Sequence, residues 1–125
     1  MDIRRTGLLG GAFGFLAVAL GAFAAHALRG SLAPGELATF ETGVRYQMYH
    51  ALALLLVAAL ARPAFPAWAR TAALAFTLGI LIFSGSLYLL VLAQLRWMGA
   101  ITPIGGVAFL VGWSALIWGS IRRES

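Results

Sequence analysis

The chain has 125 residues, of which 62% are hydrophobic and only 10% charged, and its formal net charge is +5. This composition excludes an ordinary water-soluble domain, and the short length leaves room for one domain of membrane helices. The chain has no cysteine, which excludes disulfide bonds, thiolate metal sites and thiol catalysis.

Four apolar stretches occupy most of the chain, at residues 6–28, 46–61, 71–93 and 103–121. A bilayer core about 30 Å thick requires roughly 20 apolar residues in a helix, and three of the four stretches reach or approach that length. Alternating, period-two hydrophobicity is absent, which argues against a β-barrel. We therefore predict an all-α fold: one integral membrane four-helix bundle spanning residues 1–125.

All nine basic residues are arginines, and they lie at the ends of the apolar stretches. In a soluble protein this charge would suggest nucleic acid, but here the arginines indicate topology, and we expect no nucleic-acid partner. Their bias predicts a bacterial inner-membrane protein with both termini in the cytoplasm, or in the matrix if the protein is mitochondrial. The predicted cytoplasmic arginines are Arg4, Arg5, Arg62, Arg70, Arg122 and Arg123, against Arg29, Arg45 and Arg96 on the other side.

The first stretch carries glycines at four-residue spacing, which lets helix backbones approach closely. We predict a helix-packing seam here, either inside the bundle or between two copies of the chain. Residues 1–24 also resemble a secretory signal, although the apolar run is longer than a signal requires. The seam glycines are Gly7, Gly10, Gly11, Gly14 and Gly21.

The first loop, residues 29–44, predicts a short amphipathic helix that begins at Pro34 and continues into the second span. The second stretch is only about 16 residues long, so a re-entrant hairpin of the second and third stretches is an alternative. Residues 62–70 contain Pro63 and Pro66 and predict a tight turn.

The third stretch contains a small, weakly polar patch of Gly79, Ser84, Gly85 and Ser86, for which we favour helix packing over a polar substrate path. At the start of the fourth stretch, Thr102 suits an N-cap and Pro103 the first helical position. This helix N-terminus has the free N–H groups that hold anions, but ordinary helix initiation is the favoured interpretation. Gly105 and Gly106 follow in the same segment.

Polar residues gather where the first and second stretches approach the non-cytoplasmic side. We predict a buried hydrogen-bonded cluster there, because ionisable groups in spans turn inward to find partners. Three hypotheses compete: neutral histidines that fasten helices, which is favoured; proton or ion handling; and bis-histidine ligation of a b-type haem. A metal site lacks ligands, and no metal or other cofactor is predicted. The expected cluster is His26, Arg45, Tyr46, Gln47, Tyr49 and His50.

Four segments in this order resemble the family called domain of unknown function 423, related to transmembrane protein 256. They are residues 21–28 (GAFAAHAL), 40–55 (FETGVRYQMYHALALL), 84–88 (SGSLY) and 101–106 (ITPIGG). Ala24 is one departure, since members commonly have glycine there, which puts in doubt only how tightly that turn packs. The resemblance implies a four-helix membrane protein of about this length, but no catalytic residue and no established activity.

We expect a non-enzymatic accessory, assembly or scaffolding subunit, because faces of small residues are present without a recognisable reaction centre. Its partners are the lipid bilayer and either another membrane protein or further copies of itself. The alternative is a small oligomeric transporter or channel, followed by a haem-binding electron carrier.

Overall fold

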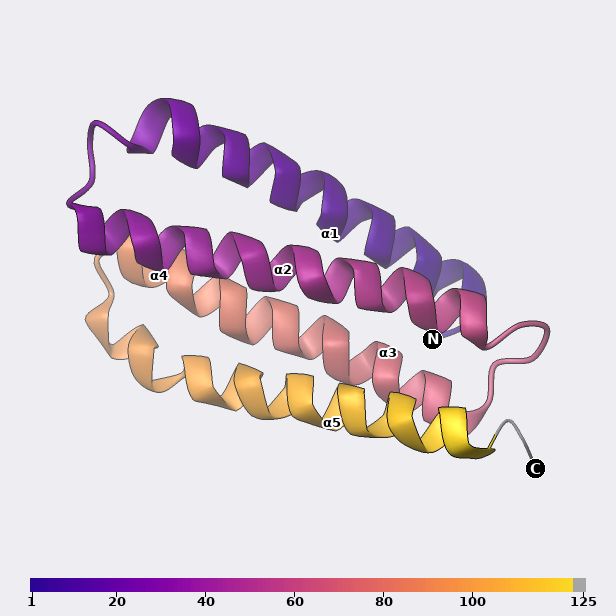
Figure 1. The fold of residues 1–125 in the computed structure, drawn as a ribbon. Coiled ribbons are helices and arrows are strands. Elements are labelled where there is room, and N and C mark those ends of the chain that lie inside the picture. Colours follow the sequence, from indigo (N-terminus) through magenta and orange to yellow (C-terminus); the bar gives the residue numbers. More distant parts are fainter. Residues whose placement is uncertain (123–125) are drawn as a thin grey trace.

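The computed structural model describes residues 1–122, and Arg123, which contributed to the predicted charge bias, lies outside them. Its long helices run antiparallel and side by side, with both ends of the described chain at one end of the molecule (Figure 1). Four helical stretches are long and apolar enough to cross a membrane: Ile3–Leu28, Pro34–Leu60, Ala67–Leu92 and Arg96–Arg122. The predicted all-α four-helix architecture is confirmed.

The elements follow one another with short connections. They are α1 (Ile3–Phe23), η1 (Ala24–Leu28), α2 (Pro34–Leu60), α3 (Ala67–Gly79), η2 (Ile80–Ser84), α4 (Gly85–Leu92), η3 (Arg96–Ala100) and α5 (Thr102–Arg122). The segments η1 and η2 are single π-helical turns within the first and third spans, and η3 is a 3₁₀ turn.

The second span begins at Pro34, twelve residues before the predicted start at residue 46. Ala33 is extended and Pro34 is the first residue of the helix. Proline has no backbone N–H, but an N–H in the first turn has no partner within the helix, so no hydrogen bond is lost. No proline interrupts the helix after this point, so the expected amphipathic segment forms the first turns of α2 and continues into the span. The re-entrant hairpin is not formed.

Helix α1 packs along α2, and one row of its small residues makes the contact. A Cβ added at Gly10 would lie 3.0 Å from the Ala51 carbonyl oxygen, whereas additions at Gly7 and Gly11 would meet nothing within 4 Å. Gly14 and Gly21 also face α2, so this part of the seam is internal to the bundle. Gly11 was wrongly grouped with it, because it lies about 100° around the helix from Gly10. Gly7 is on the same side as Gly14, but α1 and α2 do not meet there and Gly7 lines a groove between them.

The tightest contact between spans lies elsewhere, where α5 packs against α3 and η2. Gly105, Gly112 and Gly119 are spaced by seven residues on one buried face of α5. A Cβ at Gly105 would lie 2.7 Å from the Phe83 Cα, and one at Gly112 would lie 2.5 Å from the Phe76 ring. Glycine is required here because backbone and aromatic rings occupy the space a side chain would need.

The predicted N-cap at Thr102 is wrong. Thr102 is already helical, and the 3₁₀ turn η3 leads into α5. The Thr102 hydroxyl donates to the Met98 carbonyl at 3.2 Å and is hydrogen-bonded with Ser86 of α4. This helix start therefore contacts α4 through Thr102. Pro103 is exposed, and Gly106 has open space beside it.

Candidate functional site

Polar side chains of different helices meet in the middle of the bundle. Gln47 and His50 of α2 are 3% and 4% exposed, and Ser84 of η2 is fully buried. Tyr88 of α4 and Trp113 of α5 reach the same region and bond to them. This interhelical network is the candidate site because buried polar groups are rare and costly in a span.

Gln47 joins three helices. Its side-chain amide donates to the Phe13 carbonyl of α1 at 2.9 Å, and its oxygen accepts from the Tyr88 hydroxyl at 2.7 Å. The side-chain amide thus donates one hydrogen bond and accepts another from neighbouring spans, and the two bonds fix its orientation. Gln47 therefore ties the peripheral α1 to the rest of the bundle.

His50 lies 16 residues after Pro34, about 24 Å along α2 and near the centre of the span. The Trp113 indole N–H donates to its Nε2 at 3.1 Å, and Nδ1 lies 2.7 Å from the Tyr46 carbonyl oxygen. Because a carbonyl only accepts, Nδ1 carries the proton and the ring is a neutral imidazole. Its face stacks on Phe109, with 3.5 Å between ring centroids and 6° between planes.

Serines complete the contacts between spans. The Ser84 hydroxyl donates to the Gly43 carbonyl of α2 at 2.6 Å, across a close approach of the two helices. Ser86 is hydrogen-bonded with Thr102, which links α4 to α5. Of the predicted small patch, Gly79 also packs tightly, against the Phe109 ring, while Gly85 has open space beside it.

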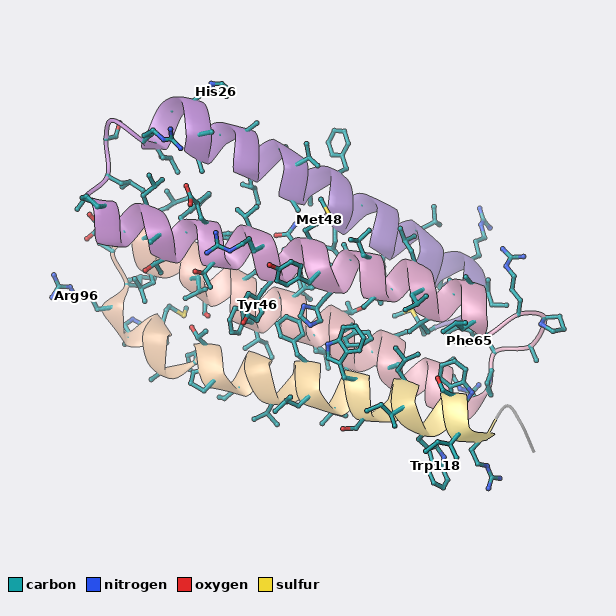
Figure 2. All side chains as sticks on the ribbon, in the orientation of Figure 1. His26, Tyr46, Met48, Phe65, Arg96 and Trp118 are labelled. Carbon is teal, nitrogen blue, oxygen red and sulfur yellow. The ribbon has the colours of Figure 1, made fainter. Side chains whose placement is uncertain are left out.

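The predicted cluster is correct for only two of its members. His26 is exposed on η1 and points away from the bundle, far from the middle of α2 (Figure 2). The expectation that His26 and His50 lie at similar depth is wrong, because residues 34–45, expected at the interface, belong to one long helix with His50. Arg45 and Tyr49 are exposed too, and Arg45 pairs with Glu41 at 4.0 Å on the surface.

Tyr46 has an intermediate role. Its ring is 38% exposed but stacks on Phe83 with centroids 4.6 Å apart, and it lies beside His50 on the α5 side of α2 (Figure 2). It covers the histidine without contributing its hydroxyl to any hydrogen bond recorded in residues 1–122. Tyr46 thus belongs to an aromatic wall around the network.

The network has little chemistry to offer. In residues 1–122, no buried side-chain nitrogen or oxygen lacks a partner, and no three histidine or acidic side chains gather to hold a metal. Both His50 nitrogens are engaged, and His26 does not come near them, so the two histidines do not form a bis-axial pair for haem. The arrangement is suited to fastening helices.

Sequence reasoning missed Trp113 and gave Tyr88 no role. A signal existed for Tyr88: it is four residues after Ser84, on one helix face with the predicted patch. No comparable signal marked Trp113, because its position among other aromatic residues of the fourth stretch is typical of lipid contact. Only the folded structure shows that the Trp113 indole, although 38% exposed, reaches His50 of α2.

The family model described as "Protein of unknown function (DUF423)" matches residues 20–106, which include the whole of α2 and the polar network except Phe13 and Trp113. The chain belongs to this family. No solved structure matches it.

Members of the DUF423 family among curated bacterial proteins are similar to the chain over most of its length. The UPF0382 inner membrane protein YgdD of Escherichia coli strain K12 is 42% identical over 111 residues, covering 89% of this chain and 85% of the relative. The UPF0382 membrane protein YwdK of Bacillus subtilis strain 168 is 45% identical over 117 residues, covering 92% and 94%. A Haemophilus influenzae UPF0382 membrane protein is 46% identical over 112 residues, covering 90% of each chain. The chain is therefore a small multi-pass membrane protein of an uncharacterised family.

Proposed function

We propose that this protein is a non-enzymatic accessory, assembly or scaffolding subunit that works through helix contacts in the membrane. One observation carries the proposal: every buried polar side chain of residues 1–122 is hydrogen-bonded. A catalytic or transport site needs groups that are free to meet a substrate or line a hydrated path. Here the network instead fixes how the four spans sit against one another.

The outer helix faces supply surface for partners. Phe15 of α1 is 76% exposed, and Leu110 of α5 is 67% exposed. A bundle that is held rigid inside and apolar outside is suited to assembly with other membrane helices, where packing and interhelical hydrogen bonds replace the hydrophobic effect.

The proposal predicts a defined partner. Extraction of the tagged protein from its native membrane in polymer-bounded lipid discs should recover one other membrane protein at a fixed ratio. Tagging that partner should recover this chain at the same ratio. A monomer or a lone homo-oligomer in both directions would contradict the proposal.

Two open glycines allow the contact surface to be mapped. Gly11 on α1 and Gly106 on α5 have nothing within 4 Å of an added Cβ, so leucine at either site avoids the packed interior, although at Gly11 it also enters the hollow between α1 and α2. Loss of the partner in one variant, with unchanged thermal stability, identifies the contact helix. If both variants retain the partner, neither the surface around Gly11 nor the surface around Gly106 forms the contact.

We also propose that both termini face the cytoplasm, because five of the eight arginines in residues 1–122 lie at the end of the bundle that holds them. A reporter fused to the C-terminus that is active only in the cytoplasm should therefore be active. Activity of a periplasm-specific reporter in its place would reverse the orientation.

A further inference from the structure

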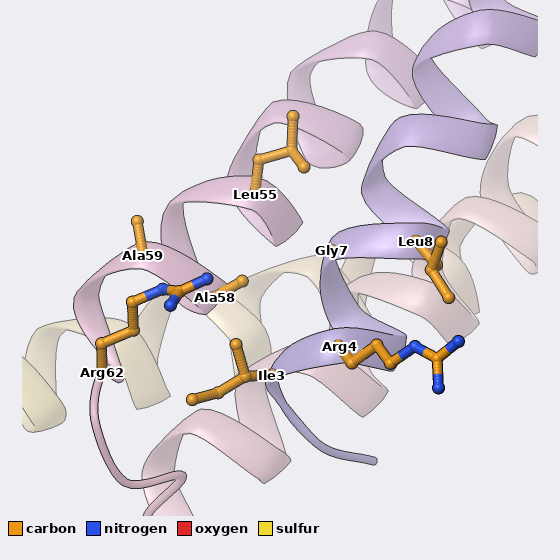
Figure 3. Close-up of a pocket in the computed structure, with 8 residues that line it drawn as sticks. All are labelled: Ile3, Arg4, Gly7, Leu8, Leu55, Ala58, Ala59 and Arg62. Carbon is orange, nitrogen blue, oxygen red and sulfur yellow. The ribbon is translucent and has the colours of Figure 1, made fainter.

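A groove opens between α1 and α2 at the end of the bundle that carries the N-terminus (Figure 3). Its volume is about 620 Å³. Apolar and small residues form its walls, and two arginines stand at its mouth. The lining includes Ile3, Arg4, Gly7, Leu55, Ala58 and Arg62.

A separate hollow lies further along α1 and α2, with the Leu55 side chain packed on Gly10 between the two. This second hollow, of about 420 Å³, shares Leu55 with the first and extends along α1 past Gly11 to Val18. The 14 residues from Arg4 to Val18 correspond to about 21 Å of helix, and one leaflet contributes about 15 Å of hydrocarbon. The two hollows together therefore extend over a length comparable to the hydrocarbon depth of one leaflet, which an acyl chain crossing Leu55 would occupy.

Among the residues that the structure describes, Arg4 and Arg62 form no salt bridge. Within residues 1–122, the acid nearest in sequence, Asp2, pairs with Arg5 at 3.8 Å. Asp2 also accepts a hydrogen bond from the Arg5 backbone N–H at 2.8 Å, which lowers the pKa of its carboxyl group and keeps it ionised on that partner. Arg4 and Arg62 thus keep positive charge available for an external anion.

The Arg62 guanidinium lies beside the groove, whereas the Arg4 guanidinium points away from it (Figure 3). Arg62 extends over the face of α2 toward Ala58, whereas Arg4 runs along the outside of α1 (Figure 3). Both side chains are exposed, so rotation about their bonds is not blocked by packing. A guanidinium group can bind two phosphate oxygens at once. Arginines near the end of a membrane span, such as Arg4 and Arg62, can contact the phosphates of lipid headgroups.

We propose that this groove binds one anionic phospholipid, with its phosphate on Arg62 and Arg4 and one acyl chain over the glycine floor of α1. A zwitterionic headgroup fits less well, because its own cation competes with the arginines. A second copy of the chain fits less well too: a two-fold axis along the membrane normal would bring four arginines together at one depth.

The test uses the full-length protein in a non-ionic detergent and native mass spectrometry with added palmitoyl-oleoyl phosphatidylglycerol or phosphatidylcholine. The wild type should bind phosphatidylglycerol more tightly than phosphatidylcholine. The R4Q/R62Q double variant should bind phosphatidylglycerol about 25-fold more weakly, with little change for phosphatidylcholine. The R5Q/R70Q variant removes the same charge at the same end of the bundle but outside the groove, and it should retain the preference.

A side chain that fills the groove provides a second test of lipid binding. A Cβ at Gly7 meets nothing within 4 Å, so Gly7→Leu should leave the melting temperature unchanged while it weakens phosphatidylglycerol binding. Gly106→Leu on α5 is the matched control. Equal binding of the two lipids, or equal losses in the two arginine double variants, would overturn the proposal. This outcome is independent of whether a protein partner is found.

Discussion

Gly105→Ala is expected to destabilise the protein severely, by at least about 3 kcal/mol. The added methyl carbon would lie 2.7 Å from both the Cα and the Cβ of Phe83, closer than Cβ atoms come to other atoms in real proteins. Phe83 belongs to η2 and its backbone is held inside the third span. Relief therefore requires α5 to move away from η2, which also separates Phe109 from Gly79.

The adjacent glycine is the control. Gly106→Ala places the same methyl group one residue further along, where nothing lies within 4 Å. Alanine is favoured over glycine within a helix by about 1 kcal/mol, so this variant should be neutral or slightly more stable. The stability of both variants can be measured by reversible unfolding in mixed micelles with increasing dodecyl sulfate, followed by circular dichroism. Equal midpoints for the two variants would show that α5 does not approach η2 as closely as described.

Gly112→Ala should fall between these two. Its nearest neighbour is the Phe76 ring, at 2.5 Å from the added carbon, and a side chain can shift where a backbone segment cannot. The order of stability expected is Gly106→Ala, then Gly112→Ala, then Gly105→Ala. A different order would indicate that the α5 interface adapts by moving the helix as a whole.

Length and hydropathy predicted the four spans, but they did not predict which face of each helix turns inward. In a soluble protein the buried face is apolar and the exposed face polar, so the sequence shows a helical period. In a membrane both faces are apolar: Phe15 is 76% exposed and Phe40 is fully buried. The seam of Gly105, Gly112 and Gly119 was therefore overlooked, although its seven-residue spacing was present in the sequence.

The polar network shows the same mixture of success and failure. Gln47 and His50 were correctly expected to be buried, because polar groups in a span find partners inside the protein. His26 was wrongly joined to them, since the membrane span was expected to begin at residue 46 and the helix before it was expected at the interface. The additional twelve residues from Pro34 place His50 about 18 Å further from the start of the span, in the middle part of α2. The helix was expected from Pro34, and counting the membrane span from that residue would have avoided the error.

His50→Ala is expected to lower the unfolding free energy by about 3 kcal/mol. The change removes the stack on Phe109, the hydrogen bond from Trp113 and the contact with the Tyr46 carbonyl, and it leaves a cavity between α2 and α5. His26→Ala is the matched control, because its exposed imidazole makes no contact of this kind in residues 1–122 and its loss should leave stability unchanged.

The phenylalanine variant separates packing from hydrogen bonding at the same position. His50→Phe keeps a ring against Phe109 but offers Trp113 no acceptor, so it should cost only about 1 kcal/mol, the scale of one interhelical hydrogen bond in a membrane. If His50 instead moved protons or ions, reconstituted vesicles would show a flux that His50→Phe abolishes while the fold persists. A fastening role requires two results. The His50→Phe protein should be stable and retain its partner, and vesicles with either histidine or phenylalanine at position 50 should show no ion flux.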